Sequence, residues 1–456
     1  MYAPPSAESR ALAAAAGEGR ADEVARLLAD PRANPAVLDN SAIIWAASHG
    51  HPEVVALLLA DPRTGPASRD NEAIRSAATY GRRDVVALLL ADPRSDPAAR
   101  DDEALRNAAC NGHAGVAALL LADPRVDPAA CDDRALRWAA ACGHAEVVAL
   151  LLADPRVDPA AGYNLAIRRA AGNVGCCGVV ALLLADPRVD PADQDNAAVI
   201  NAATGCLDTL ALLLADPRVD PAARDNMALR EAAQYGRPGA VALLLADPRV
   251  DPSAGDFDVL CWTARYGGGA AAEVAALLLA DPRVNPAARD NQALRVAAGN
   301  GKAAVVALLL ADPRTDPAAS DDEALRKAAS NGYPGVVALL LRDPRTDPAA
   351  NDDEALRTAA SNGRTMSAAL LLAHPRTNPA ALFRPGFAAF RARPPVAEAL
   401  ALRRRWSAPR AAWVAAAAAA AAALARADAE LADALAGAAA LARADAELAE
   451  ALAGCC

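Results

Sequence analysis

Apolar and polar positions follow one pattern along most of the chain, and the segment from residue 101 to residue 130 shows it clearly. Its first apolar positions, spaced as i, i+3, i+4 and i+7, are Leu105, Ala108, Ala109 and Gly112. This spacing is that of one face of an α-helix. Asp101 or Asp102 can cap the first amides of such a helix, and Gly112 can adopt the left-handed conformation that ends it. We therefore predict a helix over residues 101–112.

A second apolar stretch follows directly, from Ala114 to Ala122. Its apolar face consists of Val116, Leu119, Leu120 and Leu121. A helix through this stretch cannot continue past Pro124, because proline lacks the amide hydrogen and clashes with the preceding turn. We predict that residues 126–130 form an extended loop that leads to the next unit. The unit is thus a helix, a glycine turn, an antiparallel helix and a short extended loop.

The unit recurs about every 31 residues, which is the sequence signature of a repeat architecture. Each copy contains an Asp-Pro-Arg tripeptide or, in the last copy, His374-Pro375-Arg376. The first residues of the tripeptides are Asp30, Asp61, Asp92, Asp123, Asp154, Asp186, Asp216, Asp247, Asp281, Asp312 and Asp343. Because one copy cannot bury its apolar face alone, about twelve copies must stack. We predict an all-α helix-turn-helix solenoid with short extended loops.

The repeat resembles the ankyrin repeat. In that family a Thr-Pro-Leu-His tetrapeptide opens the first helix, followed by Ala-Ala, two variable residues, Gly-His, a Val-Val pair and a leucine run. The matching positions of one copy here are Leu136, Ala139-Ala140, Gly143-His144, Val147-Val148 and Leu150-Leu151-Leu152. The resemblance covers roughly residues 6–376 and recurs in every copy. It implies an ankyrin-type fold and a role in binding other proteins.

Two departures from the family and three breaks in register accompany this resemblance. Residues 103–106 read Glu-Ala-Leu-Arg in place of the tetrapeptide, and the loop after the leucine run is two residues shorter, so we expect a shortened or remodelled hairpin finger. Repeats 6 and 9 gain residues within 167–175 and 267–272, and repeat 7 lacks one within 199–205. Sequence drift is the simpler interpretation, because loops tolerate such changes at little cost. A binding feature is the alternative.

Candidate partner-binding positions lie on the first helix of each repeat, away from its packing face. The two residues before the turn glycine vary between copies, and we expect them to face the concave groove of the array. The resemblance implies that this pair contacts partners, and aromatic side chains there suit interface hot spots. Neutral variation at exposed positions is the competing explanation. The candidates are His49, Tyr80, Asn111, Tyr235, Tyr266 and Asn331, with the three tyrosines preferred.

Tryptophans and arginines also recur at fixed positions. Trp45, Trp138 and Trp262 precede the small-residue pair of the first helix, where we expect them to pack between neighbouring helices. The arginine of each Asp-Pro-Arg tripeptide could contribute to a rail for an acidic peptide. An aspartate lies two residues before each of these arginines and usually two after. We therefore expect a neutralised ladder of salt bridges, each worth little.

Candidate chemistry is sparse. Cys176 and Cys206 occupy equivalent positions in adjacent repeats, so their Cα atoms are expected to lie too far apart for a disulfide. The resemblance implies a structural hydrogen-bonding role for His51, His113 and His144. The sequence contains no Cys/His quartet, phosphate-binding loop, dinucleotide-binding motif, nucleophile elbow or kinase signature. We expect no catalytic residue, no cofactor and no metal site.

Composition narrows the partners and the compartment. A net charge of −10 argues against sequence-independent binding to nucleic acid, which needs a cationic surface. The longest uncharged run, residues 411–425, is shorter than a membrane span requires. Nine cysteines without a disulfide pattern, and no signal peptide at the N-terminus, favour a reducing compartment. We expect a cytoplasmic protein, with the nucleus as the alternative.

The region after the repeats divides into two predicted segments. Residues 377–412 are rich in proline and arginine, and we interpret them as a solvated linker; the arginines at 403–405 are weak evidence for a nuclear address. Residues 413–454 are rich in alanine and leucine, and eight residues at 424–431 recur at 441–448, which predicts C-terminal helices. Weak self-association, packing against the last repeat and plain low complexity remain open for this tail.

The sequence therefore predicts a non-catalytic protein-interaction scaffold. Residues 6–376 form the repeat array, which binds a partner protein through its concave groove and loop tips. The alternative is an adaptor that delivers its bound partner to an enzyme complex, such as a ubiquitin ligase, through its tail. No F-box or SOCS-like motif supports this alternative.

Overall fold

The computed structural model of the chain describes residues 6–253, 259–383 and 387–405. Within these ranges the secondary structure is entirely helical, without a strand. The chain divides into two compact units, one ending at Asp220 and the other beginning at Pro221. Each unit is an array of helical hairpins, so the predicted all-α fold is confirmed.

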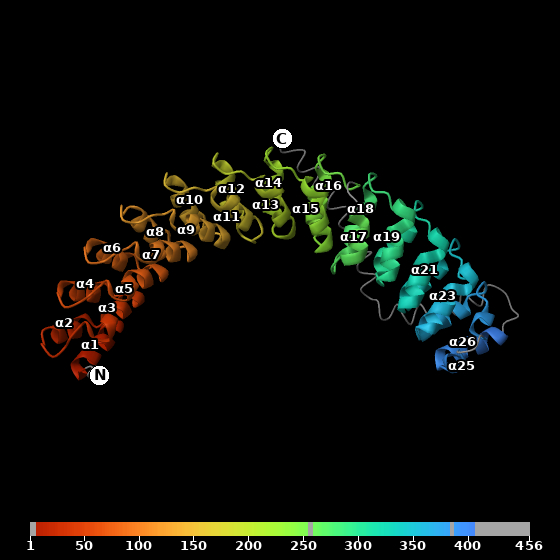
Figure 1. The fold of residues 1–456 in the computed structure, drawn as a ribbon, viewed down its shortest axis with the longest axis horizontal. Coiled ribbons are helices and arrows are strands. Elements are labelled where there is room, and N and C mark those ends of the chain that lie inside the picture. The colour runs from red at the N-terminus through yellow and green to blue at the C-terminus, as the bar shows by residue number, and fades with distance from the viewer. Residues whose placement is uncertain (1–5, 254–258, 384–386, 406–456) are drawn as a thin grey trace. The chain divides into compact units, whose positions relative to one another are not determined.

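In the first unit the odd-numbered helices are the first helices of the hairpins and the even-numbered helices are the second (Figure 1). The first helices are α1 (Ala7–Gly17), α3 (Val37–His49), α5 (Ser68–Thr79), α7 (Ala99–Cys110), α9 (Ala130–Cys142), α11 (Ala161–Ala171) and α13 (Asp193–Thr204). The second helices are α2 (Ala21–Leu28), α4 (Pro52–Ala60), α6 (Arg83–Ala91), α8 (Ala114–Leu121), α10 (Ala145–Ala153), α12 (Cys177–Ala185) and α14 (Leu207–Ala215).

The second unit continues the same order. Its first helices are α15 (Ala223–Gln234), α17 (Val259–Tyr266), α19 (Ala288–Gly299), α21 (Ala319–Asn331) and α23 (Ala350–Ser361). Its second helices are α16 (Pro238–Ala246), α18 (Ala271–Ala280), α20 (Ala303–Ala311), α22 (Pro334–Arg342) and α24 (Thr365–Ala373). A 3₁₀ turn η1 (Pro379–Phe383) and the helices α25 (Ala388–Arg391) and α26 (Pro394–Arg405) follow.

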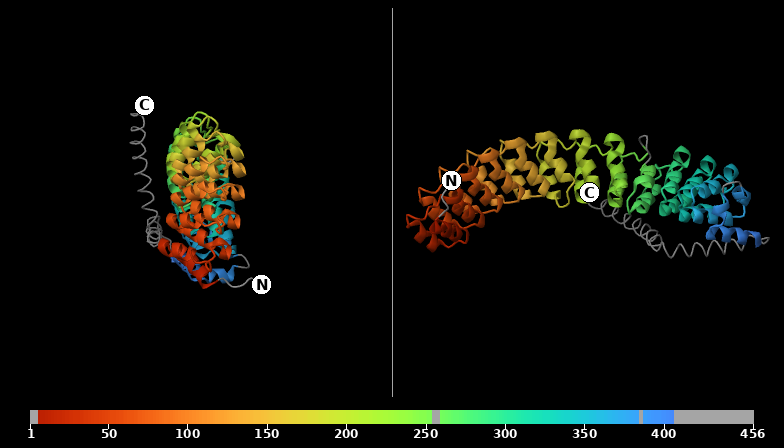
Figure 2. Two further views of the ribbon diagram at one scale, coloured as in Figure 1. Left: turned by 90° about the vertical axis from the view of Figure 1, so that its left-hand side faces the viewer. Right: turned by 60° about the horizontal axis from the view of Figure 1, so that its bottom comes forward.

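Small side chains let neighbouring hairpins pack closely. In α7 the buried residues include Ala104, Leu105, Ala108 and Ala109, and in α8 they are Val116, Ala117 and Leu120. Helix α7 contacts α5 and α9, and α8 contacts α6 and α10, so within the first unit each type of helix forms its own row (Figure 1). Figure 2 shows the stacked hairpins of this unit from two other sides. The predicted helices at 101–112 and 114–122 are therefore confirmed, with boundaries shifted by one or two residues.

The predicted capping of the first helix is wrong. In α7, residues Arg100, Asp101 and Asp102 have φ angles of 58°, 56° and 58°, so they form a left-handed turn before the right-handed helix. The carboxylate of Asp102 does not cap this helix. It is buried, and its Oδ1 accepts a hydrogen bond from the backbone N–H of Asp127 at 3.0 Å. Asp102 thus ties the start of α7 to the loop that follows α8.

This left-handed turn recurs throughout both units. It occupies the second to fourth residues of α3, α5, α7, α9, α11, α13, α15, α19, α21 and α23. A left-handed residue costs about 1–2 kcal/mol, least for glycine, asparagine and aspartate. The third residue of the turn is always asparagine or aspartate. These buried residues are Asn40, Asn71, Asp102, Asp133, Asn164, Asn196, Asn226, Asn291, Asp322 and Asp353.

The glycine turns take the predicted conformation. Gly81 has a φ of 69° and Gly112 a φ of 74°. A Cβ atom on Gly81 would lie 2.6 Å from Nδ1 of His113 in the next repeat, so the site has no room for a side chain. His113 donates from Nε2 to the carbonyl of Thr79 at 3.0 Å. His51 and His144 make the equivalent bonds to Gly17 and Cys110, which confirms the structural role of these histidines.

The Asp-Pro-Arg arginines do more than form salt bridges. Arg156 pairs with Asp154 at 2.7 Å, as expected. Its Nη1 also donates to the carbonyl of Val126 at 2.8 Å, and its Nη2 to that of Leu121, the last residue of α8, at 3.2 Å. Each such arginine therefore fastens its repeat to the preceding one, and we call it an arginine staple. The staples are Arg63, Arg94, Arg125, Arg156, Arg188, Arg218, Arg283, Arg314 and Arg345.

Aspartates two residues after these arginines have another role. Asp127 accepts a hydrogen bond from the N–H of Ala129 at 3.0 Å and so shapes the connecting loop. The loop that connects each hairpin to the next consists of two short turns, and the described ranges contain no strand. This agrees with the expected remodelling of the hairpin finger.

The described part of the predicted linker, 377–405, contains helices. Leu382, Phe390 and Val396 are buried, and α26 contacts α24 while η1 contacts α23. The 3₁₀ turn η1 and helix α26 therefore cover the end of the last repeat. The rest of the linker and the predicted tail helices at 413–454 lie outside the described residues, and the predicted domain boundaries stay predictions.

Candidate functional site

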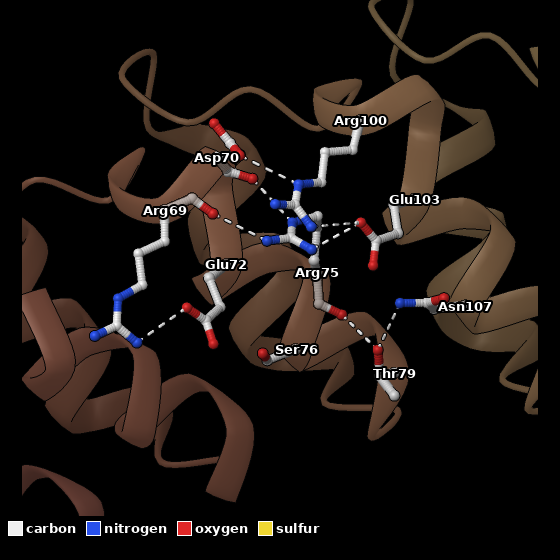
Figure 3. A pocket seen from close by; sticks show the side chains of 9 residues that line it. All are labelled: Arg69, Asp70, Glu72, Arg75, Ser76, Thr79, Arg100, Glu103 and Asn107. Atoms are coloured by element: carbon white, nitrogen blue, oxygen red, sulfur yellow. Dashed lines mark hydrogen bonds and ion pairs between the residues drawn. The ribbon is translucent and has the colours of Figure 1, made fainter. Parts of the chain in front are cut away.

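A hollow between α5 and α7 shows which side chains the first helices present on their open side (Figure 3). It has a volume of about 470 Å³. Helix α5 lines it with Glu72, Arg75, Ser76 and Thr79, and α7 contributes Glu103 and Asn107, while Arg69, Asp70 and Arg100 come from the left-handed turns. We call the surface formed by these positions of successive first helices the helix-one face.

Charges in this hollow are balanced by pairing. Arg75 Nη1 binds the Glu103 carboxylate of the next helix at 2.7 Å, and Nε of Arg75 donates to the carbonyl of Asp70 at 2.9 Å. Nε of Arg100 lies 3.2 Å from Asp70 Oδ2. Beside them, Asn107 donates to the Thr79 hydroxyl at 2.9 Å. The polar side chains are thus fixed by contacts between two adjacent repeats.

The second unit has the same kind of pair at two positions. Arg326 binds Glu354 at 2.7 Å, and Arg295 binds Glu323. Lys327 also binds Glu323 at 2.8 Å, and its hydrogen bond lowers the pKa of this carboxyl below the usual range for glutamate. Sequence reasoning missed these pairs. The signal was present as an arginine followed 28 residues later by a glutamate.

In the first unit the candidates His49, Tyr80 and Asn111 all lie exposed at the C-terminal ends of first helices. Tyr80 is 58% exposed. His49 Nδ1 lies 2.8 Å from the carbonyl of Trp45, and Asn111 donates to the carbonyl of Asn107 at 2.8 Å. The three occupy one position in consecutive repeats.

In the second unit Tyr235, Tyr266 and Asn331 occupy the same position and are also exposed. Asn331 donates to the carbonyl of Gly299 in the preceding repeat at 2.8 Å. Tyr235 is 57% exposed and Tyr266 is 46% exposed. The six candidate partner-binding residues are therefore divided equally between the two units.

In the second unit Tyr266 forms an aromatic cluster with Trp262, and Tyr235 lies on the preceding first helix. The rings of Tyr266 and Trp262 lie 4.8 Å apart, and the guanidinium of Arg265 lies 5.2 Å from the centre of the Tyr266 ring. Trp262 donates from Nε1 to the side chain of Gln234, the neighbour of Tyr235, at 2.9 Å. These contacts hold large aromatic side chains in fixed positions at an exposed surface.

The register break of repeat 9 adjoins this cluster. The N–H of Gly268 donates to the carbonyl of Gln234 at 3.2 Å, and Lys302 donates from Nζ to the carbonyl of Gly267 at 2.9 Å. The additional residues are therefore bonded to the repeats on both sides.

The tryptophans do not all pack between helices as expected. Trp45 is 43% exposed and lies against Gly17 of the neighbouring helix. Trp138 is half-buried under the guanidinium of Arg134, which lies 4.8 Å from the centre of an indole ring. Their position is equivalent to that of Ser76 and Asn107, which line the hollow, so it belongs to the helix-one face.

Other candidate chemistry can be placed directly. The seven cysteines in the described ranges are free thiols, Cys176 and Cys206 included. Among those residues no group of three or more His, Cys, Asp or Glu side chains could hold a metal ion. None of the helices in the described ranges has the length and hydropathy to span a bilayer.

Stacked helical hairpins joined by glycine turns define the class of helical-repeat proteins. The family model of ankyrin repeats, in three copies, matches residues 11–101 and 74–161, so this part of the chain is similar to ankyrin repeats, and the helical array of the described residues is consistent with that family. No curated protein matches the chain. Ankyrin repeats generally mediate protein–protein interactions and are typically non-catalytic, so the chain's partners are expected among proteins.

Proposed function

We propose that the chain is a non-catalytic scaffold that binds a partner protein through the helix-one face and the adjoining turns. The single observation that carries the proposal is the aromatic cluster of Trp262 and Tyr266, together with the exposed Tyr235 on the preceding first helix. Both tyrosines are about half exposed, although the surrounding repeats place alanine, valine and leucine in the core. Aromatic side chains held at a surface are the residue type that dominates binding energy at protein interfaces.

The rigidity of the face supports the same proposal. Side chains such as Arg75, Asn107 and Trp262 are held by hydrogen bonds to the adjacent repeat. A surface whose side chains are already ordered loses little conformational entropy when a partner binds, which favours affinity. The residues that vary between repeats then determine which partner fits.

The test is chemical cross-linking and affinity capture with the full-length chain. We compare the wild type with Tyr235→Ala/Tyr266→Ala and, separately, with Tyr80→Ala. If the cluster contacts the partner, the double variant loses a protein that the wild type captures reproducibly. Hydrogen exchange of α15 and α17 establishes that the variant is folded.

The matched control is Met366→Ala in α24. Met366 is 48% exposed on a second helix, away from the helix-one face, so its removal tests a general loss of apolar surface. Capture that is equal in the wild type, the control and both tyrosine variants would contradict the proposed contact surface. The adaptor alternative depends on residues 413–454, outside the described ranges, and no observation here favours it.

A further inference from the structure

The helix-one face of the first unit contains a run of arginines without acidic partners. In α5 this arginine is Arg75, which pairs with Glu103 of the next helix. The equivalent arginines of α7, α9 and α11 are Arg106, Arg137 and Arg168. The positions equivalent to Glu103 in the helices that follow α7, α9 and α11 hold no glutamate. They are occupied by Arg134, Leu165 and Ala197.

Neutral groups hold these guanidinium groups in place. Arg106 donates to the carbonyl of Arg100 and to the thiol of Cys131, each at 2.9 Å. Arg137 donates to the carbonyl of Cys131 at 2.6 Å, and Arg168 to the carbonyl of Tyr163 at 2.8 Å. Within the described part of the chain none of the three forms an ion pair. Backbone carbonyl groups therefore orient these guanidinium groups, and the nearby buried carboxyls of Asp102 and Asp133 form no direct ion pair with Arg106 or Arg137.

Residues near these arginines differ from their equivalents in other repeats in ways that increase the positive charge of the face. Arg134 and Arg169 are exposed on the same face, again without an ion pair to a described residue. Tyr163 stands where the turns of the flanking repeats have Asp132 and Asp195, and it is 69% exposed. Repeat 6 therefore presents two arginines and an exposed aromatic ring but no carboxylate on its first helix or turn.

We propose that these five arginines, with Trp138 and Tyr163, form a binding strip for an aspartate- and glutamate-rich segment of a partner protein. The strip comprises Arg106, Arg134, Arg137, Arg168 and Arg169. This inference rests on the proposed function, because it specifies the chemistry of a partner that the helix-one face binds. Guanidinium groups match carboxylates in geometry and form strong charge-assisted hydrogen bonds with them.

The spacing of the repeats fits an extended acidic segment. Packed helices lie about 8–10 Å apart, and an extended chain advances about 3.4 Å per residue, so every second or third residue of the segment meets the next arginine. Carboxylates at every second or third residue of the segment can therefore each pair with an arginine of the strip. A nucleic acid is disfavoured as the occupant by the net charge of −10, because sequence-independent binding to nucleic acid needs a cationic surface.

The experiment measures peptide binding to the full-length chain by fluorescence anisotropy. The probe is a fluorescein-labelled peptide of alternating glutamate and alanine, and the matched peptide has glutamine in place of glutamate. We expect the glutamate peptide to bind, and its affinity to fall as salt is added, because exposed charges are screened. The glutamine peptide is expected to bind at least about tenfold more weakly, the loss that corresponds to about 1.4 kcal/mol.

A double variant tests the strip itself. Arg134→Glu with Leu165→Glu restores the acidic positions that other repeats have, so Arg106 and Arg137 gain partners while they stay in place. We expect at least about tenfold weaker binding of the glutamate peptide. The control, Arg26→Glu with Leu207→Glu, makes the same change in charge at exposed residues of α2 and α14 and is expected to leave the affinity unchanged.

Three outcomes would overturn the inference. These are equal binding of the two peptides, undiminished binding by the double variant of the strip, and tighter binding of labelled polyuridylate than of the glutamate peptide. The strip lies in the first unit, whereas Tyr235 and Tyr266 lie in the second. If the peptide result is negative while tyrosine-dependent capture persists, only this inference falls; if capture fails while the peptide binds, the role of the aromatic cluster falls.

Discussion

Buried aspartates are the clearest place where a single residue affects the stability of this protein. Asp102, Asp133 and Asp322 occupy a position at which most of the other repeats have asparagine. Burial raises the pKa of each of these three carboxyls to about 6. Because burial disfavours the charged form, the ionised carboxylate at neutral pH weakens the fold relative to an asparagine that accepts the same hydrogen bond.

The variant Asp102→Asn is expected to stabilise α7 at pH 7.5 and to have little effect at pH 4. A carboxyl whose pKa is raised from about 3.9 in the unfolded chain favours the fold at low pH, and this contribution is lost as the pH rises from about 4 to 6. The expected gain above pH 6 is about 1–3 kcal/mol. Slower hydrogen exchange of α7 and α8 in the variant measures it.

Asp101→Asn is the control for this prediction, because Asp101 lies exposed in the same left-handed turn. It should leave the exchange rates nearly unchanged at both pH values. An equal gain for Asp102→Asn at pH 4 and pH 7.5 would show that burial of the charge is not the cause.

Between elements, the arginine staples are the contacts that join each hairpin to the one before it. Arg156 reaches Val126 and the end of α8 as well as its own Asp154. Its positive charge also lies at the C-terminal end of that helix, where the helix dipole favours cations. The first copy, Arg32, makes no such bond to an earlier carbonyl group in the described part of the chain and pairs with Asp30 and Glu8.

Replacing a staple should therefore cost more than replacing the first copy. Arg156→Gln is expected to lower the free energy of unfolding by about 1 kcal/mol, because two hydrogen bonds to the preceding repeat are lost. Arg32→Gln is expected to change it little, because only exposed ion pairs are removed. Urea unfolding of the two variants, followed by circular dichroism, makes the comparison. Equal losses would mean that the Asp-Arg pair within a repeat, and not the staple, stabilises the array.

The sequence was sufficient for the helices but not for the turn that precedes them. Helical spacing, Gly112 and Pro124 are local signals, and they predicted α7 and α8 correctly. Asp101 and Asp102 suit both a helix cap and a left-handed turn. The left-handed turn is favoured by the hydrogen bond that Asp102 accepts from the N–H of Asp127, 25 residues later. A prediction from local sequence cannot include a contact between such distant residues.

The same limit applies to the candidate site. The exposed ends of the first helices were predicted from the repeat register. The exposed position of Trp45 was not, because the exposure of a side chain depends on tertiary packing, here beside Gly17 of the preceding repeat. For residues 377–405, proline and arginine indicated a solvated linker, yet the buried positions of Phe390 and Val396 depend on their packing against the end of the array.

At the scale of the whole molecule, the described end of the second unit serves as a cap. The last hairpin, α23 and α24, would otherwise expose the apolar surface that each earlier hairpin buries against its successor. Leu382 and Val396 cover that surface and are themselves fully buried. Repeat arrays need such terminal caps, and their stability is a sum of contacts between neighbours.

Val396→Asp should therefore destabilise only the end of the array. We expect faster hydrogen exchange in α23, α24 and α26 and unchanged exchange in the first unit, because an unpaired charge in a buried position costs several kcal/mol locally. Glu398→Gln, at an exposed position of the same helix, is the control. Loss of protection throughout both units would contradict the neighbour-by-neighbour description.

The arginine staples and the turn histidines all donate hydrogen bonds from a later repeat to an earlier one. Arg156 and His113 each donate to carbonyl groups of the preceding repeat. A ribosome releases the N-terminal repeats first, so every new repeat emerges beside acceptors that are already in place. We therefore expect the repeats to fold in the order in which they are synthesised, with each repeat providing hydrogen-bond acceptors for the one that follows.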